Sequence, residues 1–594
     1  MGFMKPDLPE VDPAEFITRP LQDRLRFATQ RWVDHGFGTQ KVAFVIYVVK
    51  LLVLYAFGGV VLATATSGLH FWEVSAWWNQ PIVYQKLVLW TTLLEAIGVA
   101  GAWGPLTFKI KPMTGGIRFW ARTGTIRLRP YTWVPGTAGT RRTALDVGLY
   151  WLLLASLVLG IALPGVVVTD SSPYELVAPW LMIAPVALLV LIGLRDKTIF
   201  LAARGEQYMP AMIMFGLLPL LSFATMIVGL KLLIVVVWVG AGMSKIGKHF
   251  INVIPVMVSN SPCMPFRGLR RAHYRNAPHD LLPSRLARFM AEGLGTSVEI
   301  VAPLILLFSM NRTLTVVCAV FMVCYHLFII STFPLAVPLE WNLLFAYTAL
   351  FLFVGFPAQD GYSILDMSPS WLVLVILAAL VFFPVLGNIR PDKVSFLPSL
   401  RQYAGNWATG MWAFAPGAEE KLNRVQRQTT STVDQFVATG VDREWAELLM
   451  NMGLGWRALH SNGRGLFSTL LSHVPDVEQR TLREGELVCN TLIGFNFGDG
   501  HLHDETLVAA VQEQAGFEPG ELIVVWAESQ PITRFNQDFK IIDAALGVVA
   551  RGRWNVTECV TTQPWLPDGP VACEITWSAD HERFPLGAGL GSRA

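Results

Sequence analysis

The chain has 594 residues, of which 53% are hydrophobic and only 15% are charged, and its mean hydropathy is +0.45. Soluble domains carry about 25% charged residues, so this composition excludes an ordinary soluble protein and indicates an integral membrane protein. The net charge of +2 gives no general attraction to nucleic acid, which is not expected as a partner. Six cysteines without a CxxC spacing predict neither a zinc ribbon nor a disulfide framework.

The N-terminal segment, residues 1–41, is acidic and contains proline before its first arginines, so no cleavable signal peptide is expected there. From residue 42 to residue 388, apolar runs recur at close to the roughly 20 residues that a helix needs to cross the hydrocarbon core. We expect a transmembrane domain of about ten helices over 42–388. The predicted spans are 42–66, 84–104, 145–168, 176–194, 209–227, 229–246, 291–309, 313–333, 340–356 and 371–388.

The placement of Lys and Arg predicts the orientation of these helices. The stretch "SGLHFWEVSAWWNQPIVYQ" between the first two spans has neither residue, whereas segments 105–143, 195–208 and 245–290 are rich in both. Because basic loops stay in the cytoplasm, we expect a multi-pass plasma-membrane protein with both termini cytoplasmic. The stretch 209–243 fits two short helices joined at "VGLK" or one tilted span, and the basic segment after it favours two.

The composition changes after the last predicted span. We interpret 389–424 as a linker with surface helices and 425–594 as a soluble domain of mixed α/β type. In that domain "ELIVVWAES" predicts a buried strand, "DETLVAAVQEQAGF" a helix with Asp504 as N-cap, and "PWLPDGPVACEITWSA" a turn and a strand. The expected fold is an all-α polytopic membrane bundle followed by a soluble α/β domain.

Charged residues within the predicted spans need a reason, because each costs about 2.5–3.5 kcal/mol at the bilayer centre. Lys50 and Glu95 lie at similar depths in adjacent antiparallel spans, which predicts a buried ion pair between them. The alternative is a functional role for Lys50, as a proton relay or as the ligand of a substrate carboxylate.

A second group of ionisable residues lies on later spans. Glu299 in "GLGTSVEIVAPLIL" and His326 in "VCYHLFIISTFP" belong to neighbouring spans joined by a short turn, so we expect them within a few helical turns of each other. Lys245 ends the sixth span, and Glu340 opens the ninth span on the same side. Lys245 is either an anchor that extends to the membrane surface or a reactive amine in an apolar pocket.

These same segments carry a resemblance. "WVGAGMSKIGKHF", "EGLGTSVEIVAPLILLFSM" and the helix with His326 are similar to the membrane core of the vitamin K-dependent gamma-carboxylase-like (HTTM) superfamily. The resemblance implies catalytic roles for Lys245, Glu299 and His326, with Lys245 as the base that deprotonates a quinone-like substrate. The carboxylase site is lumenal, whereas the charge pattern places Lys245 on the cytoplasmic side. The whole chain, including "GFNFGDGHLHDE", more closely resembles an uncharacterised actinobacterial membrane family, domain of unknown function 3556.

His501 and His503 form an HxH pattern, in which two imidazoles share a metal if the segment is extended. The alternative is a polar loop that caps the following helix. For the whole protein two function classes stay open. One is a membrane enzyme acting on a lipid- or quinone-like substrate or cofactor. The other is a non-enzymatic lipid transporter or scaffold, with membrane lipids and envelope proteins as partners.

Overall fold

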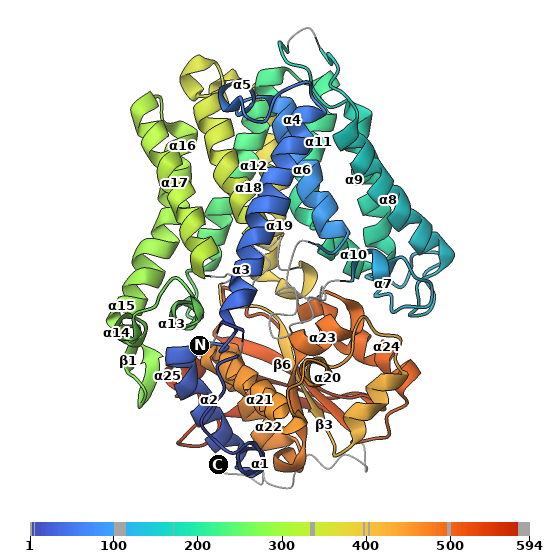
Figure 1. Ribbon diagram of the computed structural model, residues 1–594, viewed down its shortest axis with the longest axis vertical. Coiled ribbons are helices and arrows are strands. Elements are labelled where there is room, and N and C mark those ends of the chain that lie inside the picture. The colour runs from blue at the N-terminus through green and yellow to red at the C-terminus, as the bar shows by residue number, and fades with distance from the viewer. Residues whose placement is uncertain are drawn as a thin grey trace.

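The computed structural model describes residues 3–4, 6–99, 115–169, 172–332, 339–395, 398, 400–401, 404–495 and 500–579. A helical bundle stands above a smaller region built around one β-sheet, and the helices nearest the N-terminus lie in the sheet region (Figure 1). The helices of the bundle are α3 (Lys41–Val49), η1 (Lys50–Phe57), α4 (Gly58–Ala65), α5 (Val74–Trp77), α6 (Pro81–Ala96), α8 (Ala144–Ala162), α9 (Pro179–Arg195), α11 (Gly205–Gly216), α12 (Phe223–Ser244), η3 (Phe289–Thr296), α16 (Ser297–Phe308), α17 (Arg312–Thr332), α18 (Leu339–Ala349), η4 (Leu350–Gly355) and α19 (Leu372–Ile389).

Among the described residues, six helical stretches are long and apolar enough to cross a membrane, and a bent pair of helices makes up to seven. The six are 41–65, 144–162, 223–244, 285–308, 312–332 and 372–389, and the bent pair is 340–355 with 358–366. All seven coincide with predicted spans. The other three predicted spans correspond to the shorter helices α6, α9 and α11, of 16, 17 and 12 residues. A total of ten spans therefore stays a prediction.

The stretch 209–243 contains two helices, as the basic segment after it favoured, but they do not join at "VGLK". The break lies earlier, between α11 and α12, where Pro219 sits in a short 3-10 turn. Ser222 then accepts a hydrogen bond from the backbone N–H of Thr225 and caps α12. "VGLK" consequently lies inside α12, which is 22 residues long.

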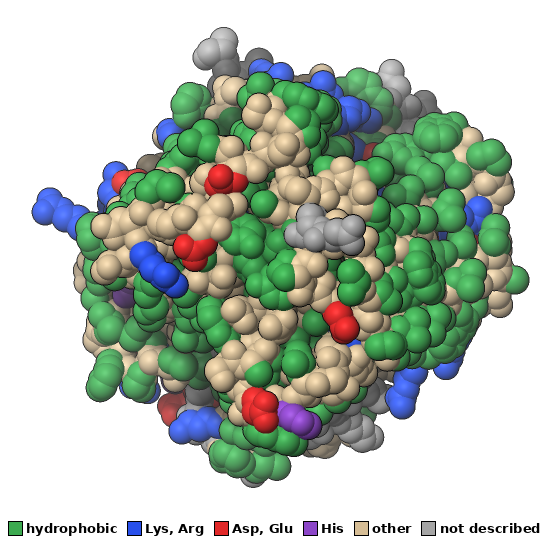
Figure 2. Space-filling view, turned by 90° about the horizontal axis from the view of Figure 1, so that it is seen from above, with side chains coloured by type: hydrophobic (Ala, Val, Ile, Leu, Met, Phe, Trp, Pro, Cys, Tyr) green, Lys and Arg blue, Asp and Glu red, His purple; other side chains and the backbone are tan. Residues whose placement is uncertain are grey.

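The two ends of the bundle differ in charge. Figure 2 views the end away from the sheet, which is covered mainly by hydrophobic and uncharged side chains with a few scattered charges. The opposite end carries several short elements between the bundle and the sheet: α7 (Gly116–Trp120), α10 (Lys197–Ala202), α13 (Phe250–Asn260), α14 (Arg267–Ala272), α15 (Arg285–Arg288), η7 (Pro391–Lys393) and the hairpin β1 (Tyr274–Asn276) with β2 (Asp280–Pro283). Most of the basic residues predicted to lie in loops are in or beside these elements.

The sheet has six antiparallel strands in the order β4-β3-β5-β6-β7-β8. Its strands are β3 (Thr409–Phe414), β4 (Thr481–Glu484), β5 (Leu522–Ala527), β6 (Asn536–Asp543), β7 (Gly547–Asn555) and β8 (Cys573–Ser578). β3 and β5 are buried along their whole length, and Trp412 faces Val524 in their ladder. The predicted strands within "ELIVVWAES" and "PWLPDGPVACEITWSA" are confirmed as β5 and β8.

Helices from both ends of the chain surround this sheet. They are α20 (Thr432–Val437), α21 (Arg443–Leu459), α22 (Ser461–His473), α23 (Gly485–Ile493), α24 (Glu505–Ala515) and α25 (Val556–Thr561), with α1 (Pro13–Thr18) and α2 (Leu21–His35) from the N-terminus. The predicted helix with Asp504 as N-cap is confirmed as α24. α2 packs on α21, where Arg24 donates to Asn451 Oδ1 at 3.1 Å and Phe16 is fully buried.

The sheet region holds the corner between α12 and α13 through buried polar contacts. The imidazole of His249 contacts Ser461 Oγ at 2.6 Å and Gln530 Oε1 at 2.5 Å. Arg464 donates to Asn252 Oδ1 at 3.1 Å. The segment that begins with Lys245 is therefore positioned by both halves of the molecule.

Candidate functional site

Lys245 and Glu299 form a buried ion pair between α12 and α16. Lys245 Nζ lies 2.6 Å from both carboxylate oxygens of Glu299, and the two side chains are 8% and 6% exposed. Tyr325 Oη donates a third hydrogen bond to Glu299 Oε1 at 3.1 Å. This bidentate contact directs the Lys245 side chain into the bundle rather than out to the membrane surface.

Gly242 lets α12 and α16 approach closely beside this pair. A Cβ on Gly242 would lie 2.8 Å from a side-chain carbon of Ile300 and 3.2 Å from Cβ of Glu299. A larger residue would push α16 away from α12. The spacing of Gly242 and Lys245 in "AGMSK" thus has a direct packing reason.

His326 lies in the same region but does not bond to Glu299. Trp238 Nε1 donates to His326 Nε2 at 3.0 Å, and His326 Nδ1 lies 2.7 Å from Asn342 Oδ1. Because an indole N–H can only donate, Nε2 is unprotonated, and the amide oxygen then takes the proton-bearing Nδ1 as its donor. His326 is held as the neutral Nδ1–H tautomer.

These groups line one cavity of about 370 Å³ between α12, α13, η3 with α16, α17 and α18. Its wall is mostly apolar, with polar atoms contributed by Lys245, Glu299, Tyr325, His326 and Asn342. Cavities of this size with a few converging polar groups are typical of small-molecule sites. The structure thus brings together the three residues for which the resemblance implies catalysis.

Trp238 and Asn342 belong to the candidate site and were not predicted from the sequence. Trp238, Ala241 and Lys245 share one face of α12 at spacings of three and four residues, and all three line the cavity. This spacing was visible in the sequence. Asn342 follows Glu340 and Trp341 at the start of α18, where nothing in the sequence marks it as the partner of an imidazole.

The predicted Lys50–Glu95 pair is replaced by other contacts. Lys50 Nζ lies 2.9 Å from Glu340 Oε1, so Glu340 belongs with Lys50 and not with Lys245. Glu95 Oε1 lies 3.8 Å from Nε of Arg204. Arg204 comes from a segment expected to be a basic cytoplasmic loop, and its burial against Glu95 depends on tertiary packing that the sequence does not display.

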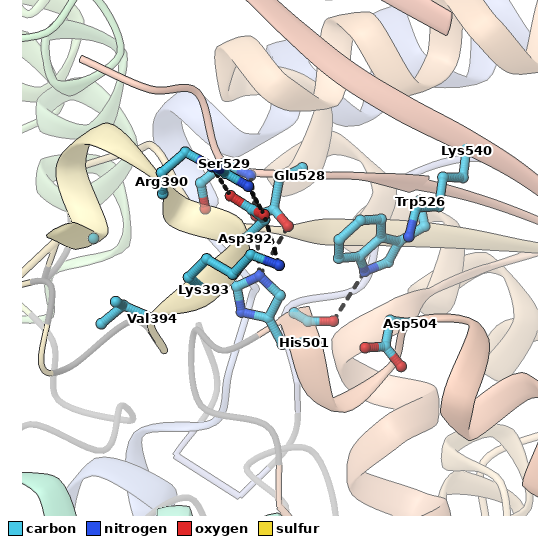
Figure 3. A network of polar contacts seen from close by, with 12 residues as sticks. Arg390, Asp392, Lys393, Val394, His501, Asp504, Trp526, Glu528, Ser529 and Lys540 are labelled. Carbon is cyan, nitrogen blue, oxygen red and sulfur yellow. Dashed lines mark hydrogen bonds and ion pairs between the residues drawn. The ribbon is translucent and has the colours of Figure 1, made fainter. Parts of the chain in front are cut away.

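The HxH residues have separate environments. His501 Nε2 lies 2.9 Å from a carboxylate oxygen of Glu528, beside the Arg390–Asp392 pair that follows α19 (Figure 3). His503 is fully buried. His501 lies in a 3-10 turn, Gly500–Leu502, so the extended conformation needed for two imidazoles on one side is not formed. Within the described residues, no three metal-ligating side chains gather in one place, and Asp499 lies outside those residues.

Comparisons with known proteins assign the chain to a family but not to an activity. No curated protein and no solved structure shows significant similarity to it. A family model described as "Transmembrane protein of unknown function (DUF3556)" matches residues 1–576. Since the match covers nearly the whole sequence, the chain belongs to the DUF3556 family of transmembrane proteins.

Proposed function

We propose that the protein is a membrane enzyme that moves a proton on a lipid- or quinone-like substrate bound in the cavity between α12, α16 and α17. The observation that carries this proposal is the Lys245–Glu299 ion pair in the wall of an apolar cavity. A charged pair in such surroundings costs several kcal/mol of desolvation for each ion, and packing alone does not require it. The resemblance to the HTTM superfamily points to the same residues.

The ion pair gives the site one mobile proton. The substrate's acidic O–H bond breaks, its proton goes to the Glu299 carboxylate, and the electron pair stays on the substrate oxygen. The Lys245 ammonium then faces the new anion and stabilises it. Lys245 itself becomes a base only after passing its proton to Glu299, which refines the role that the resemblance implies. His326, whose two ring nitrogens are bonded to Trp238 and Asn342, shapes the cavity wall against which the substrate lies.

The basic elements between bundle and sheet support an orientation with the sheet region and both termini in the cytoplasm, and with the bundle in the plasma membrane. The cavity then lies toward the cytoplasmic end of the bundle. This is the side that the charge pattern predicted for Lys245.

A second observation favours lipid transport as an alternative. Another apolar cavity, of about 420 Å³, lies between α11, α12 and α19. α19 is exposed along most of its length, as expected for a helix that faces lipid. Val237 lines both cavities, so a single helix separates two spaces that fit lipid chains.

Mass spectrometry of molecules retained by the gently solubilised protein tests the proposal. We expect a retained amphiphile in the wild type, and the same amphiphile in Lys245→Met and Glu299→Gln proteins. In cells, these two variants should accumulate that molecule unconverted.

Lys231→Met is the matched control, because Lys231 is a buried lysine of the same helix whose Nζ donates to the Tyr362 carbonyl away from the cavity. A Lys245→Met strain with an unchanged lipid and quinone profile, alongside a deletion strain with a changed one, refutes the enzyme. A molecule that is unchanged chemically but redistributed between leaflets identifies the transporter.

A further inference from the structure

One wall of the cavity belongs to the helical span 285–308, whose first turn carries two arginines. Met290, Leu294 and Val298 line the cavity at four-residue spacing along η3 and α16. Leu286, four residues before Met290, continues this row of apolar side chains to the first turn of the 285–308 span and is 37% exposed. α15 lies at the end of the bundle nearest the sheet, close to α13, which forms another wall of the cavity (Figure 1).

This first turn presents cations beside exposed apolar side chains. Arg285 and Arg288 are both exposed, and Phe289 next to them is 58% exposed. An aromatic and two guanidinium groups at the start of a membrane span lie at the depth of lipid headgroups. The row of apolar side chains therefore leads from the headgroup level into the cavity.

Neither Arg285 nor Arg288 has an acidic partner among the described residues, whereas two other arginines of this segment do. Arg271 forms an ion pair with Asp34 at 2.5 Å, and Arg275 pairs with Asp280 at 2.8 Å. Arg270 is occupied by three carbonyl oxygens. Two arginines of this segment are neutralised by carboxylates and a third is engaged by carbonyl oxygens, whereas Arg285 and Arg288 leave positive charge for a ligand from outside the chain.

We propose that Arg285 and Arg288 select an anionic lipid with a phosphate headgroup as the molecule that enters the cavity. The planar guanidinium fork matches phosphate oxygens, and the apolar row accepts the lipid's chain. Arg288 and Glu299 are eleven residues apart along one helix, a rise of about 16 Å, so the lipid must be long enough to reach from the headgroup level to the Lys245–Glu299 pair. This inference rests on the proposed function for the cavity being the substrate site.

The test measures lipid retained by the full-length protein after purification from mixed micelles. These contain phosphatidic acid and phosphatidylcholine with identical acyl chains, at low salt. Wild-type protein should retain phosphatidic acid in preference. Arg285→Gln/Arg288→Gln should reduce that preference by about fivefold for each arginine, and thus by about 25-fold in total, since each basic residue near a charged surface contributes about that factor.

Two controls separate the possible failures. Arg275→Gln/Arg551→Gln removes the same charge from exposed positions that already have partners, and it should leave the preference unchanged. Val298→Trp fills the cavity and should reduce retention of both lipids together.

An undiminished preference in the Arg285/Arg288 variant, or an equal loss in the Arg275/Arg551 control, overturns the selection by these two arginines and leaves the proposed function standing. Retention that Val298→Trp does not change shows that lipid sits elsewhere, which removes the cavity as the substrate site and the proposed function with it.

Discussion

Replacing one member of the Lys245–Glu299 pair should destabilise the protein far more than replacing both. At 2.6 Å and an effective dielectric constant of about 20, Coulomb's law gives an attraction of about 6 kcal/mol. Desolvation of both ions offsets part of this gain, but a lone buried charge keeps its desolvation cost and loses the attraction. Lys245→Met and Glu299→Gln should each lower the free energy of unfolding by about 3–5 kcal/mol.

The double variant Lys245→Met/Glu299→Gln should recover most of that loss, because it leaves no unpaired charge and the glutamine still accepts from Tyr325. The assay is a double-mutant cycle on equilibrium unfolding in mixed micelles, with Lys231→Met as the reference for removing a buried lysine. A buried, coupled pair would be refuted if each single variant lost less than about 1 kcal/mol in free energy of unfolding and the two losses simply added in the double variant.

Two further predictions concern the sheet region. Burial lowers the pKa of His249 to about 4, so below about pH 6.5 the unfolded chain takes up a proton that the folded chain does not. The free energy of unfolding is therefore unaffected by His249 above pH 6.5 and falls by up to about 3 kcal/mol as the pH is lowered toward 4. In the His249→Gln variant the melting temperature should depend less on pH. An unchanged dependence of melting temperature on pH contradicts this. Gly465→Ala would place Cβ 2.1 Å from the Trp554 ring and should cost about 1–3 kcal/mol, whereas Gly453→Ala, with nothing within 4 Å, should gain up to about 1 kcal/mol. Melting temperatures in the opposite order would contradict the packing at Gly465.

Hydropathy predicts the positions of the long membrane helices well, because an apolar run of span length is itself the physical requirement for insertion. It is weaker for α11, whose end depends on Pro219 and on a serine cap rather than on a change in hydropathy. β3 lies in the segment expected to be a linker. As a six-residue strand buried on both faces it shows no period-two alternation, so local pattern cannot distinguish it.

The candidate site was also predictable only in part: its ionisable residues were found from the sequence, but several of their partners were not. Lys245, Glu299 and His326 were identified because charged and imidazole groups are rare within apolar spans. Their partners were not all predictable. Pairing of Lys50 with Glu340 joins residues that are nearly 300 positions apart, and depth alone does not select between Glu340 and Glu95. Which helices are neighbours is decided by side-chain packing across the whole bundle, which a single sequence does not reveal.

The contact of α2 with α21 also fixes an order of events during synthesis. Arg24 and Asn451 are 427 positions apart, with the whole membrane bundle between them in sequence. At about 5–20 residues per second, a ribosome needs about 20–85 s to make the second after the first. For that interval Phe16 and Trp32, buried in the finished protein, have no α21 to cover them. The sheet region can therefore complete its packing only after the last membrane helix has been synthesised. A fully folded sheet region thus implies that the whole bundle has already been made.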